Sequence, residues 1–270
     1  MTGGKAARVS VVAPCRNERG HIRAFLENLL RQERDGLECE FLIADGMSDD
    51  GTREILEEYA RKFPEIRVVD NPGRIVSTGL NAAIRAARGE IVVRMDVHAR
   101  YAEDFLKSAV GVLEETGAEN VGGAIRAEAS DYWGKAVAAA FHAPYVCGGA
   151  ATRRPDFEGP TDTVFPGCWR KETLEGIGLF DEALVRNQDD ELNYRLTKAG
   201  GVVWQSPKIR CWYEPRNSLR KLFWQYFQYG FWKVAVIRKH RLPARLRLSL
   251  IHISEPTRLL SISYAVFCLK

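Results

Sequence analysis

The first third of the chain alternates short apolar runs with amphipathic segments, and this alternation restricts the fold more than any other feature. Apolar runs at 9–13, 41–44, 67–69 and 91–95 predict buried strands, and the segments at 21–32, 52–63 and 77–87 predict the helices between them. Strands joined by helices in this order form a parallel, doubly wound sheet. We therefore predict an α/β fold with a mostly parallel sheet and helices on both faces.

Three of these strands lead into polar loops that carry an acidic residue, namely Glu18, Asp45 and Asp96. Because the carboxyl ends of parallel strands meet at one edge of a sheet, we expect the three carboxylates to be neighbours there. The alternative is that such acids cap the helices that follow. The first loop lacks the Gly-x-Gly-x-x-Gly pattern, which argues against a dinucleotide-dependent dehydrogenase.

Asp96 and His98 follow the fourth predicted strand directly. Residues two apart on an extended chain share a face, so this carboxylate and imidazole can converge on one divalent cation. Asp-x-His is also common in solvated loops, and the spacing alone does not decide between the two interpretations.

Overall composition sets wider limits. The net charge is +4, from 39 basic and 35 acidic residues, and the six cysteines form no Cys-x-x-Cys pair. Buried thiols in a reducing cytosol are the simplest interpretation. No signal peptide is evident, and no apolar run reaches the ~18 residues needed to cross a bilayer. The sequence as given is predicted not to be an integral membrane protein.

Several short motifs follow one another along the chain, within a resemblance that runs from about Val9 to about His240. They are Val11-Val12-Ala13-Pro14-x-x-Asn17-Glu18, Ala44-Asp45-Gly46-x-Ser48-x-Asp50-Gly51-Thr52, Asn71-x-Gly73 with Gly79-Leu80-Asn81, Asp96-x-His98, Gly178-x-Phe180-Asp181-Glu182 and Gln188-Asp189-Asp190-Glu191-Leu192-x-x-Arg195. Together they resemble glycosyltransferase family 2, the inverting nucleotide-sugar transferases with a GT-A, Rossmann-like fold. The stretches 94–101 and 213–216 are similar to those of succinoglycan-type exopolysaccharide transferases.

The resemblance implies a nucleotide-sugar site at the edge of the sheet. Asp45 would contact the uracil base, while Pro14, Asn17 and Glu18 would line the base and ribose pocket. Arg74 would meet the diphosphate, since a guanidinium suits paired phosphate oxygens. Asp96 and His98 would hold Mn²⁺ or Mg²⁺. His98 stands where the family usually has a second acid, and an imidazole tilts the preference toward Mn²⁺.

Asp189 is the predicted catalytic base, which would take the proton of the acceptor hydroxyl. Alternatively, Asp189 is only a helix-capping acid, because 187–191 opens a predicted helix at 192–199. The neighbouring Asp190 could also be the base instead of Asp189. Gln188 replaces an acid that often precedes the base in the family. Trp169, Asp190 and Arg195 are assigned to the acceptor side, with 163–170 as a wall; Trp169 fits a core position equally well. The stretch 130–160 is expected to be a loop that orders over substrate.

The chain becomes basic and aromatic near its end, with no Asp or Glu between Arg216 and Arg247. We predict an amphipathic helix at 219–239 that meets an anionic membrane surface and a lipid-linked saccharide. A helix packed on the core with solvated cations is the alternative. Nucleic acid is not expected as a partner, because no nucleic-acid motif accompanies the patch. The segment 248–270 fits no family pattern and is predicted to be a non-native or truncated tail that packs poorly.

These expectations divide the chain into a catalytic domain at 1–215, the basic helical segment at 216–247 and the tail at 248–270. Within the catalytic domain, 8–100 would bind the nucleotide and 101–215 the acceptor. The predicted activity is inverting, metal-dependent transfer from a nucleotide-sugar, UDP-hexose above all, to a lipid-linked saccharide in exopolysaccharide synthesis. It would take place at the cytoplasmic face of the membrane. The rival predictions are a nucleotidyltransferase and a membrane-binding module without catalysis.

Overall fold

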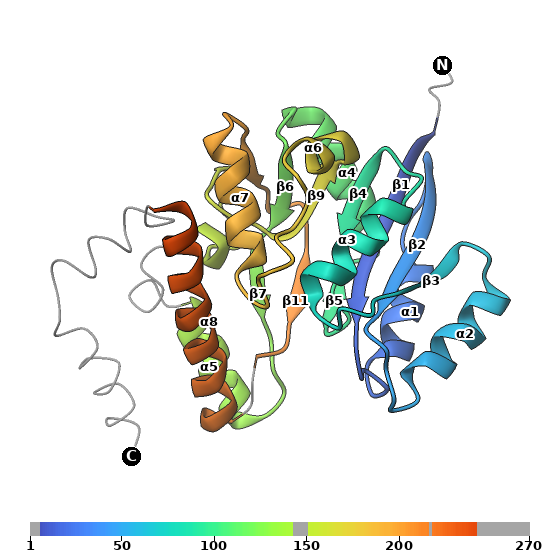
Figure 1. Cartoon of the computed structure of the whole chain (residues 1–270), viewed down its shortest axis with the longest axis horizontal. Coiled ribbons are helices and arrows are strands. Elements are labelled where there is room, and N and C mark those ends of the chain that lie inside the picture. Colours follow the sequence, from blue (N-terminus) through green and yellow to red (C-terminus); the bar gives the residue numbers. More distant parts are fainter. Residues whose placement is uncertain (1–5, 143–150, 216–217, 242–270) are drawn as a thin grey trace, which may run out of the picture.

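The apolar runs of the first third form neighbouring parallel strands at the centre of the molecule. The computed structural model describes residues 6–142, 151–215 and 218–241 (Figure 1). The strands are β1 (Ala7–Cys15), β2 (Leu37–Asp45), β3 (Ile66–Asp70) and β4 (Ile91–Arg94), and they lie in the order β3-β2-β1-β4. Their middle residues, including Val11, Ile43 and Val93, are fully buried, as expected for strands covered on both faces.

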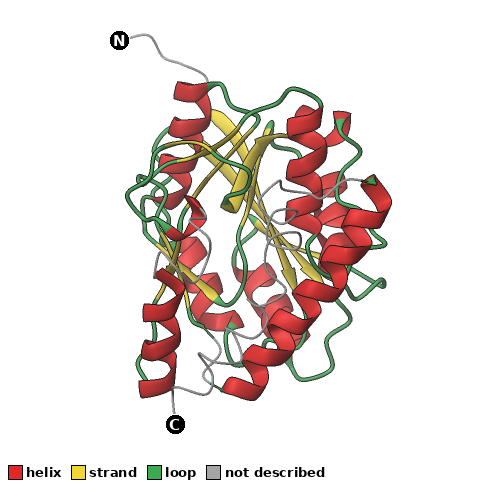
Figure 2. Cartoon of the chain, turned by 90° about the vertical axis from the view of Figure 1, so that its left-hand side faces the viewer, coloured by secondary structure: helices red, strands yellow, loops and turns green. Residues whose placement is uncertain are grey.

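Helices cover both faces of this sheet, because each presents an apolar stripe to one of two cores. These helices are α1 (Ile22–Leu30), α2 (Thr52–Lys62), α3 (Val76–Ala86), α4 (Phe105–Thr116), α6 (Lys171–Gly176) and α7 (Gln188–Lys198). The first core packs β1 and β2 against α1, α2 and α4, and the second packs the other face against α3, α6 and α7. Figure 2 shows the strands enclosed between helices. The predicted α/β fold is confirmed.

The second half extends the sheet and adds a smaller one. Its strands are β5 (Ala99–Tyr101), β6 (Asn120–Gly123), β7 (Ile125–Ala127), β8 (Gly159–Pro160), β9 (Phe165–Arg170), β10 (Val203–Gln205) and β11 (Cys211–Tyr213), with a short 3₁₀ turn at Ala151–Arg153. The main sheet continues as β4-β9-β6-β10-β8, with β9 antiparallel to both neighbours, and β5-β11-β7 form the small sheet. Strand β9 therefore lies between β4 and β6, although it follows both of them in the sequence.

Two further helices, α5 (Tyr132–His142) and α8 (Leu219–His240), lie outside the main sheet. The expectation of a substrate-covering loop at 130–160 is wrong for its first part, because 132–142 is helical; residues 143–150 lie outside the described part. The predicted basic helix is present as α8, which lies beside α7 (Figure 1).

The predicted tail at 248–270 also lies outside the described residues. Among the helices that the structure describes, none is both long and apolar enough to span a bilayer.

Glu191 joins α7, α8 and the loop after α6. Its side chain is fully buried and accepts hydrogen bonds from Arg195 at 2.7–3.0 Å, while His240 Nε2 lies 2.9 Å away. Arg195 also donates to the carbonyls of Ile177 and Leu179. Burial opposes the charge of Glu191, but the hydrogen bonds and charge of Arg195, with His240 and Lys239, hold its pKa below the usual value.

We expect Glu191→Ala to lower the free energy of unfolding by about 3–5 kcal/mol, because it leaves Arg195 without its buried partner. Since the pKa of Glu191 is lowered on folding, its contribution is present above the unfolded pKa and is lost as pH falls through the folded pKa. Urea unfolding at several pH values measures both effects. Glu175, which is 55% exposed and pairs with Lys171 at 3.6 Å, provides the control, Glu175→Ala, with an expected loss below about 1 kcal/mol. Equal losses in the two variants would contradict the assignment.

Candidate active site

Two adjoining cavities open beyond the carboxyl ends of β1 and β4. The first has a volume of about 590 Å³ and the second about 1280 Å³. They share the side chains of Pro14, Val76, His98, Arg186, Tyr213 and Lys221. These residues come from the strand edge, from α3, from the loop before α7 and from the start of α8. Because the two cavities share them, they form one continuous site.

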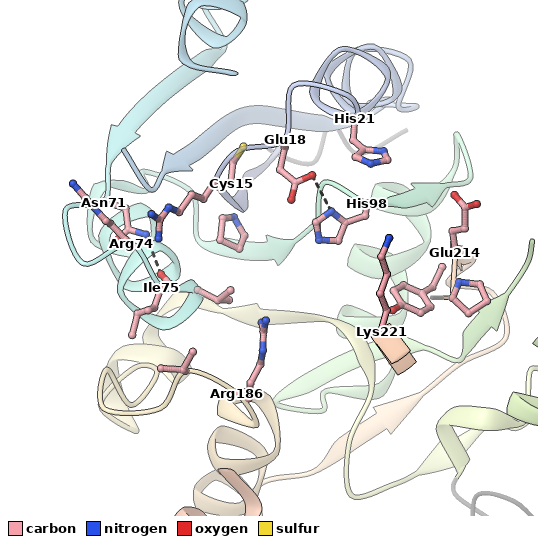
Figure 3. A pocket seen from close by; sticks show the side chains of 16 residues that line it. Cys15, Glu18, His21, Asn71, Arg74, Ile75, His98, Arg186, Glu214 and Lys221 are labelled. Carbon is pink, nitrogen blue, oxygen red and sulfur yellow. Dashed lines mark hydrogen bonds and ion pairs between the residues drawn. The ribbon is translucent and has the colours of Figure 1, made fainter. Parts of the chain in front are cut away.

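The first cavity is polar and carries cations on opposite sides. Glu18 and His98 lie side by side in its lining, with Glu18 Oε2 3.2 Å from His98 Nδ1 (Figure 3). Arg74 lies at one end, and Arg186 and Lys221 extend into it from the opposite wall. Arg74 adopts a left-handed backbone conformation with φ 59°, and its N–H donates to the carbonyl of Asn71 at 3.0 Å. Arg16 also lines this cavity, so four Arg and Lys side chains surround one hollow and suit a ligand with several negative charges.

The second cavity contains a buried arginine between two carboxylates. Arg94 is 8% exposed at its side chain and donates to both oxygens of Asp96, at 2.8 and 3.0 Å. It also donates to Asp189, which lies 95 residues away in the sequence at the first turn of α7. The Asp96 N–H lies 2.5 Å from the hydroxyl of Tyr101, whose side chain is buried in the core. Arg94 therefore holds an acid of the strand edge and an acid of α7 in one place.

Asp189 remains accessible at the head of this cavity, with 37% of its side chain exposed. Burial by the surrounding protein raises its pKa, and the negative charges of Asp96 and Asp190 act in the same direction. The guanidinium of Arg94 opposes them but does not cancel them. A carboxylate with a raised pKa that faces a cavity is suited to accept a proton.

Asp96 and His98 lie on a turn between β4 and β5, and not on an extended strand as the spacing suggested. Both nevertheless line the second cavity, and His98 also lines the first. Over the described ranges, no group of three or more His, Cys, Asp or Glu side chains is arranged to hold a metal ion. A carboxylate and an imidazole that line one cavity are donor types that a divalent cation accepts, and in this structure Asp96 is paired with Arg94 and His98 Nδ1 with Glu18.

Comparison with known proteins decides the family. The model of "Glycosyl transferase family 2" matches residues 10–172, more than half of the chain. The chain belongs to glycosyltransferase family 2. It is 36% identical over 239 residues to the succinoglycan biosynthesis protein ExoA of Rhizobium meliloti (strain 1021), covering 88% of this chain and 72% of that protein. The predicted resemblance to succinoglycan-type transferases is confirmed.

Solved structures of other transferases share the fold. The mannosyltransferase PcManGT from Pyrobaculum calidifontis, in complex with GDP-Man and Mn²⁺, matches with a TM-score of 0.62 at 21% identity, covering 97% of this chain and 80% of that one. TarS of S. aureus, in complex with UDP, matches with a TM-score of 0.54 at 18% identity, covering 76% and 60%. The fold of this transferase is GT-A, as predicted.

Two residues assigned to the nucleotide of the transferase lie outside both cavities. The Asp45 carboxylate is 2% exposed, accepts from the Ser48 hydroxyl at 2.6 Å and lies 3.4 Å from Arg53. Asn17 exchanges hydrogen bonds with Asp49 at 2.9 and 3.1 Å, which ties the first loop to the second. In this structure both residues fix the loops that border the first cavity, and their contact with the base stays a prediction.

Of the three acceptor-side residues, only Asp190 lines a cavity, where it pairs with Lys233 of α8 at 2.8 Å. Trp169 is 2% exposed and packs edge-on against Phe180, so it is a core residue and does not reach a sugar in this structure. Arg195 is held by Glu191 and by backbone carbonyls. The predicted wall at 163–170 is present only at Thr163, Val164 and Phe165, because β9 carries the remainder into the sheet.

The sequence analysis missed Arg94 and the inner face of α8. A signal for Arg94 was available, because an arginine that ends a strand as apolar as Ile91-Val92-Val93 is buried and requires an acidic partner. The α8 residues that line the second cavity, among them Tyr229 and Lys233, had no comparable signal. Their place depends on how α8 folds back along α7.

Proposed function

We propose that this family 2 transferase moves a hexose from UDP-hexose to a lipid-linked saccharide in exopolysaccharide synthesis, with inversion at the anomeric carbon. The observation that carries the proposal is the Arg94 bridge, which brings Asp96 from the strand edge and Asp189 from α7 to one cavity beside a cationic hollow. The similarity to ExoA supports the polysaccharide, and the UDP complex of TarS supports the donor.

The first cavity is proposed to hold the donor. Arg74, Arg186 and Lys221 would meet the diphosphate, and Pro14 and Glu18 would border the base and ribose. Asp96 and His98 would hold Mn²⁺ or Mg²⁺, which when bound neutralises charge on the departing diphosphate. The Mn²⁺ complex of PcManGT supports a divalent ion here.

Asp189 is proposed to act as the base in a single displacement. The acceptor oxygen forms a bond to the anomeric carbon, the bond from that carbon to the diphosphate oxygen breaks, and its electron pair leaves with the nucleoside diphosphate. The acceptor proton moves to the Asp189 carboxylate, which Arg94 holds in place. Attack opposite the leaving group inverts the configuration of that carbon.

The second cavity is proposed to hold the acceptor. Its volume is about twice that of the first, and half-exposed aromatic side chains of α8, Trp224 and Tyr226, form part of its wall. Aromatic faces suit sugar rings, and the same residues suit a lipid interface. We place the reaction at the cytoplasmic face of the membrane, with the protein bound peripherally through its basic helix.

Calorimetry with UDP, GDP and ADP, each with and without Mn²⁺, tests the proposal. We expect UDP to bind most tightly and its affinity to fall at least about tenfold without Mn²⁺. Asp96→Asn should remove most of that Mn²⁺ dependence, whereas Asp35→Asn, at an acid 88% exposed in a distant turn, should not. The proposal is rejected if no nucleotide binds, or if Asp96→Asn leaves the Mn²⁺ effect unchanged.

A further inference from the structure

Helix α8 exposes large apolar side chains along much of its length. Phe223, Phe227 and Phe231 are 66%, 53% and 63% exposed, and Val234 is 48% exposed. These residues recur every three or four positions and therefore form one stripe along the helix, called here the outer stripe. An ordinary surface helix buries such a stripe against its own core. An exposed stripe of large apolar side chains marks a surface that meets another apolar phase or partner.

Arginines stand at both ends of the outer stripe. Arg220, which also borders the second cavity, precedes Phe223 by three positions, and Arg238 follows Val234 by four, so helical spacing puts both backbone positions on the same side as the stripe. Every charged residue from 216 to 247 is basic. Long cationic side chains beside aromatic rings fit the headgroup region of an anionic phospholipid surface, where the charge stays hydrated while the rings enter the interface.

The inner face of α8 contacts the turn that carries Asp189. The side-chain amide of Asn187 donates to the carbonyl of Tyr229 at 2.8 Å, and Lys233 donates to Asp190 at 2.8 Å. These two contacts flank Asp189 on either side in the sequence. The position of α8 therefore fixes the first turn of α7, together with Arg94 from the opposite side.

We propose that the outer stripe docks on an anionic phospholipid surface, and that the inner-face contacts of α8 thereby order the turn that carries Asp189. Peripheral binding through α8 is already part of the proposed function, on which the catalytic meaning of Asp189 also rests; the docking face and its coupling to the turn of Asp189 go beyond it. The second cavity is bordered by α8, so a lipid-linked acceptor can keep its lipid anchor in the same surface while its saccharide enters the cavity. Helix α8 would then serve both to dock the protein on the membrane and to border the cavity that receives the acceptor.

Sedimentation with vesicles tests the docking. The full chain should bind phosphatidylglycerol/phosphatidylcholine vesicles, bind pure phosphatidylcholine more weakly, and lose affinity as salt is raised. Phe227→Ser/Phe231→Ser should lower partitioning by about tenfold or more. Neither residue lines the first or the second cavity, so nucleotide binding should be unchanged. Val202→Ser, at an apolar residue 42% exposed elsewhere, is the control and should bind vesicles like the parent protein.

Amide hydrogen exchange tests the coupling. Anionic vesicles should slow exchange at 186–191 in the parent protein and not in Phe227→Ser/Phe231→Ser. Lys233→Met should still bind vesicles but lose most of this protection, because its link to Asp190 is gone. Vesicle binding without slower exchange at 186–191 overturns the coupling. Absence of vesicle binding overturns the docking. If the parent protein then self-associates and Phe227→Ser/Phe231→Ser does not, the outer stripe is a contact between two copies of the chain. UDP calorimetry on the same samples reports separately on the proposed function.

Discussion

Replacing Asp189 with Asn is expected to slow sugar transfer by about 10²–10⁴-fold while leaving UDP affinity nearly unchanged. The amide cannot accept the acceptor proton at its nitrogen, but its oxygen can keep the hydrogen bond from Arg94, so the cavity should retain its shape. Transfer is measured as UDP released in the presence of acceptor, and UDP affinity by calorimetry. A loss confined to turnover identifies the residue as acting in the chemical step.

Asp190→Asn is the matched control for this variant, because Asp190 is the adjacent acid and lines the same cavity. It should cost much less turnover, since it weakens the link to Lys233 but leaves the Asp189 carboxylate and its hydrogen bond from Arg94 in place. If Asp190→Asn abolishes transfer and Asp189→Asn does not, the base has been assigned to the wrong residue. The two neighbouring carboxylates therefore have different partners, Lys233 of α8 and the buried Arg94, and their Asn variants should differ in the size of the loss.

The pH dependence of transfer gives a further expectation for Asp189. Burial and the charges of Asp96 and Asp190 raise the pKa of this carboxyl, although Arg94 opposes them. The base is active only when ionised, so transfer should rise with pH through an apparent pKa above the ~3.9 of an ordinary Asp. A turnover profile that is flat down to pH 4 would contradict this direction.

Much of the fold and part of the site could be predicted from local sequence. The strands β1, β2 and β4 are continuous apolar runs, and their parallel order places Glu18, Asp45 and Asp96 at one edge of the sheet. Local pattern could not show that Ser48 and Arg53 cover Asp45, because that depends on how a loop closes. Nor could it distinguish a core Trp169 from a sugar-stacking one, because insertion of β9 between β4 and β6 decides its burial.

Arg94 has the least predictable role, because its partners are two residues and 95 residues away in the sequence. Its guanidinium occupies both oxygens of Asp96, so a divalent cation has to share that carboxylate with a buried positive charge. We expect Arg94→Gln to bind Mn²⁺ roughly tenfold more tightly, since a nearby like charge is removed. We also expect turnover to fall by about 10–10²-fold, since Asp189 loses the group that positions it.

Tighter Mn²⁺ binding together with slower turnover would show that Arg94 positions Asp189, because simple damage to the fold would weaken both. Mn²⁺ affinity is measured by electron paramagnetic resonance and turnover by UDP release. Arg94→Lys keeps the charge but not the paired hydrogen bonds, so its Mn²⁺ affinity should stay near that of the parent while turnover still falls. Arg67→Gln removes another partly buried arginine, paired with Glu40 away from both cavities, and should lower stability without changing Mn²⁺ affinity. If Arg94→Gln weakens Mn²⁺ binding and turnover together, Arg94 instead supports the shape of the cation site, because loss of a competing charge cannot reduce cation affinity.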